Sequence, residues 1–184
     1  RVAPPAAAAA QFVAQFGAQL GARFGAQFSD PHPLLPLQFS KRLAAFCANA
    51  KFELPEEGRT LAKTVKEMRD DFGLRSVYCW HTLGGYWGGV STTSPDTAHL
   101  SPTQRRAAPT ASLLDVEPAL SWDAGSVCGV GVVTPDATEG LMRGIHSYLA
   151  ESGVDGVKID AQSGLSSFGR GLGGGPHMVR RYVQ

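Results

Sequence analysis

The stretch that decides the fold is Gly153-Val-Asp-Gly-Val-Lys-Ile-Asp160. Gly153 ends a helical pattern, and the β-branched residues that follow are typical of a short buried strand. Lys158 and Asp160 are two positions apart, so on a strand they point to the same face. A charged pair at the end of a buried strand costs desolvation energy unless it is paired or used in chemistry. The stretch therefore indicates either a structural ion pair or part of an active site.

Upstream of this stretch, apolar strands alternate with amphipathic helices. In chain order the predicted elements are a strand at 52–54, a helix at 60–71, a strand at 75–80, a long loop at about 81–122, a strand at 127–133, a helix at about 134–152 and a strand at 154–160. This alternation predicts an α/β fold with a parallel sheet covered by helices. A doubly wound sheet and a (β/α)8 barrel both satisfy the pattern, and four strands would be about half of such a barrel.

Local signals support the two long helices. Thr60 is a candidate cap for the first helix and Gly73 a candidate stop. The second helix has a start signal at Thr134-Pro135. The expected apolar faces are Leu61, Val65, Met68 and Phe72 in the first helix, and Leu141, Ile145, Tyr148 and Leu149 in the second.

Residues 1–38 differ in composition from the remainder, and we expect the globular domain to span residues 39–184. A large apolar residue recurs every four positions, as Phe12, Phe16, Leu20, Phe24 and Phe28, and a proline-rich linker follows. The segment is expected to be disordered or marginally helical, and a remnant of an organelle transit peptide is the alternative. The chain begins at Arg1 and finishes within a helical pattern, so we expect a fragment of a longer protein.

Composition excludes several classes of function. The 184 residues carry a formal net charge of +1 and no basic run, which argues against nucleic-acid binding. No apolar run is long enough for a membrane span. The histidines show no metal-binding spacing, so neither metal nor other cofactor is expected. The three cysteines are odd in number and widely spaced, which favours reduced thiols in the cytosol or the plastid stroma.

One glycine pattern resembles a nucleotide-binding fingerprint. Gly169, Gly171 and Gly174 fit GxGxxG, but the fingerprint normally follows its strand directly. Here the predicted strand ends at Asp160, so we interpret the stretch as simply glycine-rich.

A second informative stretch follows the strand predicted at 75–80. Trp80, His81, Tyr86 and Trp87 lie among four glycines within residues 78–89. Aromatic rings stack on the apolar faces of sugars, and histidine and tyrosine can bind hydroxyl groups. The alternative is a hydrophobic plug over the rim of the sheet.

Together these stretches resemble one family. The matching residues are Trp80-His81, Tyr86-Trp87-Gly88-Gly89, Glu117-Pro118, the run 129–133 and the run 153–160. They resemble the raffinose synthase and seed imbibition protein family, which comprises plant galactosyltransferases and alkaline α-galactosidases of the retaining α-galactosidase clan. The resemblance covers about residues 41–184.

The resemblance implies the N-terminal part of a (β/α)8 barrel, incomplete in this chain. Asp160 would be the nucleophile that forms a galactosyl-enzyme intermediate. Lys158 would bind a sugar hydroxyl and keep Asp160 ionised, and Trp80, His81 and Trp87 would line the galactose subsite. The acid/base would come from a later strand that residues 1–184 lack. Asp155 is no substitute, because it lies an odd number of positions from Asp160 and faces the opposite side.

The implied reaction transfers galactose from galactinol to sucrose to make raffinose. Hydrolysis of raffinose-family sugars and a non-catalytic remnant are the alternatives. These 184 residues alone are expected to be inactive. The sequence does not specify an oligomeric state.

Overall fold

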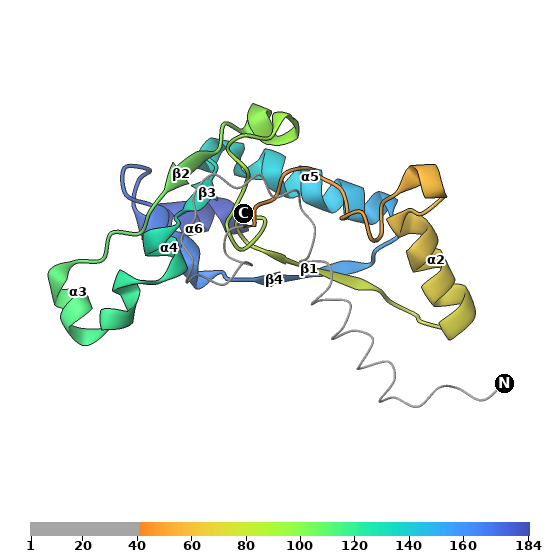
Figure 1. Cartoon of the computed structure of the whole chain (residues 1–184), viewed down its shortest axis with the longest axis horizontal. Coiled ribbons are helices and arrows are strands. Elements are labelled where there is room, and N and C mark those ends of the chain that lie inside the picture. Colours follow the sequence, from red (N-terminus) through yellow and green to blue (C-terminus); the bar gives the residue numbers. More distant parts are fainter. Residues whose placement is uncertain (1–40) are drawn as a thin grey trace.

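The computed structural model describes residues 41–184, which form a mixed α/β fold with two small sheets (Figure 1). The strands are β1 (Tyr78–Thr82), β2 (Thr103–Arg105), β3 (Val130–Val132) and β4 (Gly156–Asp160). The helices are α2 (Leu61–Phe72), α3 (Ala111–Val116), α4 (Ala124–Val127), α5 (Thr138–Glu151) and α6 (Gly175–Val183), with short 3-10 helices between them. The predicted α/β class is therefore confirmed, while the segment 1–38 lies outside the described residues.

Helix α2 forms where its local signals predict. The Thr60 side chain accepts a hydrogen bond from the Lys63 amide at 3.1 Å, and Gly73 ends the helix in the left-handed conformation. Leu61, Val65 and Met68 are buried in the smaller of two core clusters. The expectation for Phe72 is wrong, because the last turn of the helix extends beyond that cluster and leaves this side chain 56% exposed.

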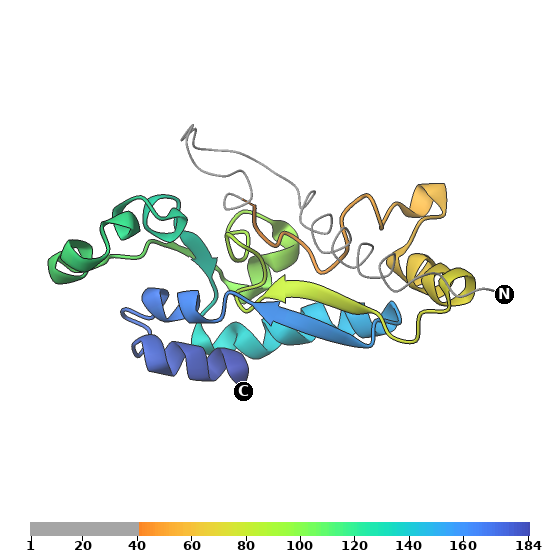
Figure 2. The same ribbon diagram turned by 90° about the horizontal axis from the view of Figure 1, so that it is seen from below.

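Strands β1 and β4 pair in parallel and hold the residues that the sequence singles out. Trp80 lies opposite Lys158 and Thr82 opposite Asp160. Figure 2 shows the two strands side by side with α5 running along one face of the pair. His81 of β1 contacts His146 of α5, and alternate residues of a strand point to opposite faces, so Trp80 and Lys158 share the face that points away from α5.

A second set of strand contacts crosses the molecule near β3. Val90 forms a parallel bridge with Leu43, and Gly89 forms one with Gly131. The amide of Val90 donates to the Gly131 carbonyl at 2.8 Å, and the Gly131 amide donates to the Gly88 carbonyl at the same distance. These bridges follow the expected parallel direction. The partner of β3 does not, because β2 and β3 pair antiparallel.

The strand expected at 52–54 is absent. The amides of Phe52 and Glu53 both donate to the Asn49 carbonyl at 2.9 Å, which turns the chain, and Leu54 makes only an isolated bridge with Arg59. Phe52 is nevertheless buried, so its apolar character reflects core packing rather than a strand.

The long loop expected at 81–122 is also more ordered than predicted. It contains the 3-10 helices Pro95–Leu100 and Pro118–Ser121 as well as β2 and α3. The α3 region extends away from the β1–β4 pair (Figures 1 and 2). The strand expected at 127–133 is shorter, because Val127 ends α4.

Helix α5 packs as its periodicity predicts. Leu141 and Ile145 are buried, and Leu149 packs against both core clusters. Thr134 precedes a 3-10 helix, Pro135–Ala137, and its side chain makes no capping hydrogen bond. The ring of Tyr148 is half-buried, and its hydroxyl donates to Glu53 at 2.8 Å.

Candidate active site

Asp160 is the last residue of β4, and its carboxylate is held by two donors. The indole Nε1–H of Trp80 donates to Oδ2 at 2.9 Å, and the amide of Ala161 donates to Oδ1 at 2.8 Å. Ala161 has a φ of 52°, a left-handed conformation that is uncommon for residues other than glycine. Such strain is often retained at functional sites, and here the strained residue is the one whose amide donates to the carboxylate.

These donors keep Asp160 ionised. The hydrogen bond from Trp80 lowers the pKa of Asp160 most, and the Ala161 amide lowers it further. Lys158 contributes less, since its Nζ lies 3.8 Å from Oδ2 and its side chain is 73% exposed. An ionised carboxylate at a strand end, open to solvent, is available as a nucleophile.

The aromatic residues after β1 divide into buried and half-buried rings. Tyr86 is buried, and burial raises the pKa of its hydroxyl. Trp80 packs edge-on against Tyr86 at a centroid distance of 5.9 Å and tilts against Trp87 at 5.4 Å. Tyr86 thus belongs to the core, as the plug interpretation expects. The half-buried Trp80 contacts the Asp160 carboxylate, and the half-buried Trp87 packs against Trp80.

His81 lies on the other face of β1. It is buried, and its Nε2 is 3.1 Å from Nε2 of His146 on α5. Burial lowers the pKa of His81, and the neighbouring His146 lowers it further, although its contact with the Thr82 carbonyl opposes the shift. The structure therefore brings together Asp160, Lys158, Trp80 and Trp87, and it separates His81 from them.

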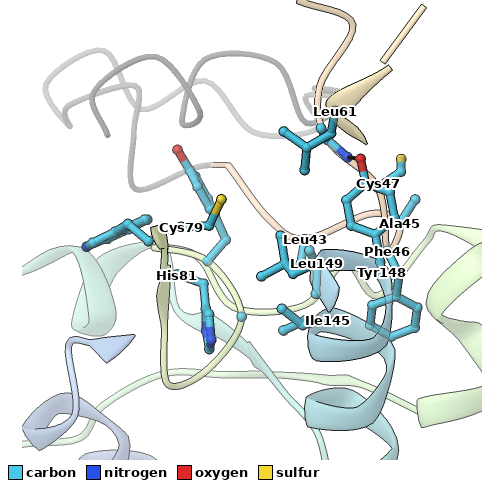
Figure 3. Close-up of a pocket in the computed structure, with 14 residues that line it drawn as sticks. Leu43, Ala45, Phe46, Cys47, Leu61, Cys79, His81, Ile145, Tyr148 and Leu149 are labelled. Carbon is cyan, nitrogen blue, oxygen red and sulfur yellow. Dashed lines mark hydrogen bonds between the residues drawn. The ribbon is translucent and has the colours of Figure 1, made fainter. Parts of the chain in front are cut away.

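An apolar pocket of about 60 Å³ lies between β1, α5 and the segment 43–48 (Figure 3). Cys79 and His81 of β1 line it, together with Ile145 and Leu149 of α5. Burial raises the pKa of the Cys79 thiol to about 11, so this thiol is not a nucleophile at neutral pH. Trp80 also lines the pocket, but Asp160 does not, and we assign the pocket no catalytic role.

Asp155 lies just before β4, at the end opposite Asp160. Its carboxylate accepts from Arg69 at 2.6 Å and from the Val77 amide at 2.8 Å. These bonds tie the start of β4 to α2 and to the start of β1, which is a structural role. Residues 41–184 contain no group of three or more potential ligands arranged to hold a metal ion.

Sequence reasoning missed one residue at the site and one behind it. Ala161 acts through its backbone amide, which no side-chain pattern reveals. His146 lies 65 positions from His81 and contacts it only because α5 packs beside β1.

No helix in the described part of the chain is long and apolar enough to cross a bilayer.

Comparison with known proteins identifies the family. Residues 34–184 match the family described as raffinose synthase or seed imbibition protein Sip1. The chain is 34% identical to a probable galactinol–sucrose galactosyltransferase 6 of Arabidopsis thaliana over 145 residues, which cover 78% of the chain and 19% of the relative. It is 34% identical to a galactinol–sucrose galactosyltransferase of Oryza sativa subsp. japonica, with 79% and 18% covered, and to a stachyose synthase of Pisum sativum, with 76% and 16% covered.

The chain thus spans about a fifth of the length of these curated relatives. The match includes the β1–β4 pair and the residues that hold Asp160. The chain belongs to the raffinose synthase and seed imbibition protein family.

Proposed function

We propose that this chain supplies the nucleophile of an enzyme that transfers an α-galactosyl group from galactinol to sucrose with retention. The observation that carries the proposal is the Asp160 carboxylate, ionised and held by Trp80 and Ala161 at the end of β4. The names of the relatives, which are galactosyltransferases and a stachyose synthase, support transfer rather than hydrolysis.

In the first step an oxygen of Asp160 attacks the anomeric carbon of the galactosyl group. The bond to the inositol oxygen breaks, and an acid group protonates that oxygen as it leaves. In the second step the same group takes the proton from a sucrose hydroxyl, whose oxygen attacks the anomeric carbon and releases Asp160. Two displacements restore the α configuration. The acid/base carboxyl must lie about 5–5.5 Å from Asp160.

The neighbouring residues have distinct roles in this proposal. The donors from Trp80 and Ala161 orient the carboxylate and keep it charged before attack. Lys158, which extends into solvent on the same face, binds a galactose hydroxyl. Trp80 and Trp87 supply the apolar surface for the sugar ring. His81 lies on the opposite face, so its proposed contact with galactose has the least geometric support.

A (β/α)8 barrel is the architecture that we propose for the intact domain, with residues 39–184 as its first part. The face of β1–β4 that carries Lys158 and Tyr78 is open around these two residues, with Tyr78 63% exposed, although Thr82 on the same face is buried. The other face lies against α5 (Figure 2). In a barrel the open face would point inward, and the carboxyl ends of the strands would hold the catalytic groups.

The cytosol or plastid stroma is the proposed compartment, because Cys47, Cys79 and Cys128 are free thiols.

The experiment is an assay of the longer polypeptide that contains this segment, with galactinol in the presence and absence of sucrose. Formation of raffinose that is lost in Asp160→Asn supports the proposal. The substitution keeps the shape of the side chain and removes its nucleophilic charge, so the expected loss is at least 1,000-fold. Free galactose as the only product would make the enzyme an α-galactosidase, and full activity of Asp160→Asn would exclude this nucleophile.

Residues 1–184 alone are expected to show no turnover, because no acid/base is assigned within them. Activity of the purified 184-residue chain that disappears in Asp160→Asn would contradict this expectation while supporting the nucleophile.

A further inference from the structure

The two histidines that link β1 to α5 take no part in the two displacement steps proposed above. His81 is 6% exposed, and each of its ring nitrogens has a partner. Nδ1 lies 2.7 Å from the Thr82 carbonyl oxygen, and Nε2 lies 3.1 Å from Nε2 of the half-buried His146. A buried imidazole with both nitrogens engaged has a fixed ring orientation.

The partners also fix the tautomers. A carbonyl oxygen only accepts, so Nδ1 of His81 carries the proton that it donates to Thr82. Burial lowers the pKa of His81, so its ring is neutral and its Nε2 has a lone pair. His146 must then donate from its own Nε2–H. The tautomers of the two rings are therefore opposite.

His81 lies between two residues that contact Asp160, Trp80 within β1 and Leu83 just after it. On one side is Trp80, whose indole donates to the carboxylate at 2.9 Å. On the other side β1 ends at Thr82, and the amide of the next residue, Leu83, donates to the Asp160 carbonyl at 2.8 Å. A displacement of the His81 ring would therefore move both contacts at once.

We infer that His146 is a positioning residue for the nucleophile. By donating to His81 it holds the carboxyl end of β1 against α5, and β1 in turn aims the Trp80 indole at the Asp160 carboxylate. The role in catalysis rests on the proposed function, but the mechanical link from α5 to Asp160 does not. This role requires no contact between either histidine and the sugar.

The test compares His146→Leu with His146→Gln. Leucine and glutamine are about equally good helix formers, so neither disturbs α5 through propensity. Glutamine retains an N–H donor for His81, whereas leucine removes it. A structural role that depends only on packing would affect the variants alike or favour leucine. Rescue by glutamine is the signature of the hydrogen bond.

The first readout is the indole N–H signal of Trp80 in nuclear magnetic resonance spectra of the 184-residue chain. It is expected to shift and broaden in His146→Leu and to remain near its wild-type position in His146→Gln. In the wild-type protein, long-range proton–nitrogen spectra should show His81 as the Nδ1–H tautomer and His146 as the Nε2–H tautomer. The opposite tautomers, or a Trp80 signal that is the same in all three proteins, would overturn the inference.

The second readout is turnover of the longer polypeptide. One lost hydrogen bond corresponds to roughly a 5- to 10-fold decrease, so kcat should fall by about that factor in His146→Leu and stay within about twofold in His146→Gln. KM should change little. Equal kcat in the two variants would refute the catalytic part of the inference. If Asp160→Asn is active while the Trp80 signal responds as expected, the proposed function fails and the link between α5 and Asp160 stands.

Discussion

Gly131→Ala should destabilise the fold because two backbones meet at this residue. A Cβ at Gly131 would lie 1.8 Å from the Val90 carbonyl oxygen, whereas ordinary contact begins near 3.4 Å. The two segments must therefore separate by more than an ångström. That movement stretches the 2.8 Å bonds from Val90 to Gly131 and from Gly131 to Gly88 beyond hydrogen-bonding distance.

The magnitude follows from the buried bonds that are lost. Two backbone hydrogen bonds contribute about 1 kcal/mol each, and leaving their buried groups unpaired adds to the loss. We expect the free energy of unfolding to fall by about 2–4 kcal/mol. Urea denaturation followed by circular dichroism measures the change, provided that the slope of the transition is unchanged.

Gly164→Ala is the matched control. No atom lies within 4 Å of a Cβ built at Gly164, and its φ is outside the left-handed region. The control should change stability by at most about 0.5 kcal/mol. If Gly131→Ala behaves like Gly164→Ala, the contact between the segments around Val90 and Gly131 is not part of the stable fold, and the reasoning is refuted.

Two further predictions concern hydrogen bonds to hydroxyl and carboxylate groups. Trp80→Phe removes the principal hydrogen-bond donor to Asp160, so the pKa of Asp160 should rise, which a ¹³C carboxyl titration measures. The control Trp122→Phe, at an exposed site, should leave that pKa unchanged. Since a depressed pKa adds stability above the ordinary carboxyl value of 3.8 and loses it as the pH falls, the variant should also lose less stability on acidification. Tyr148→Phe deletes a hydroxyl that accepts from a backbone amide and donates to a carboxylate, both at 2.8 Å, so urea denaturation should show a loss of about 1–3 kcal/mol. The exposed Tyr78→Phe should stay within about 0.5 kcal/mol, and equal effects of the two tyrosine substitutions would contradict the reasoning.

Features that depend on neighbours in sequence could be predicted. The cap at Thr60, the apolar spacing and the stop at Gly73 all lie within one short segment, and together they define α2. The strand before Asp160 and the shared face of Lys158 and Asp160 follow from the two-residue period of a strand.

Features that depend on partners distant in the sequence could not be predicted. The residues of β2, Thr103–Arg105, are polar, and they form a strand because β3 pairs beside them. Phe52–Leu54 has strand-like side chains, but among the described residues only Leu54 forms a bridge, and hydrogen bonds to Asn49 turn the segment instead. Apolar character alone therefore does not distinguish a strand from a buried turn.

The same division holds at the candidate site. Sequence reasoning found Asp160 and the residues near it but assigned Trp80 and His81 to one surface. Adjacent residues on a strand cannot share a face, and the structure separates them accordingly: Trp80 contacts the carboxylate and His81 contacts α5. The Trp-His pair is thus better understood as a connection through β1. His81 holds the strand against α5, and Trp80 orients the nucleophile. This explains why a buried histidine can lie directly beside a residue of the site. It also explains why replacing its partner on α5 should be detected at Asp160.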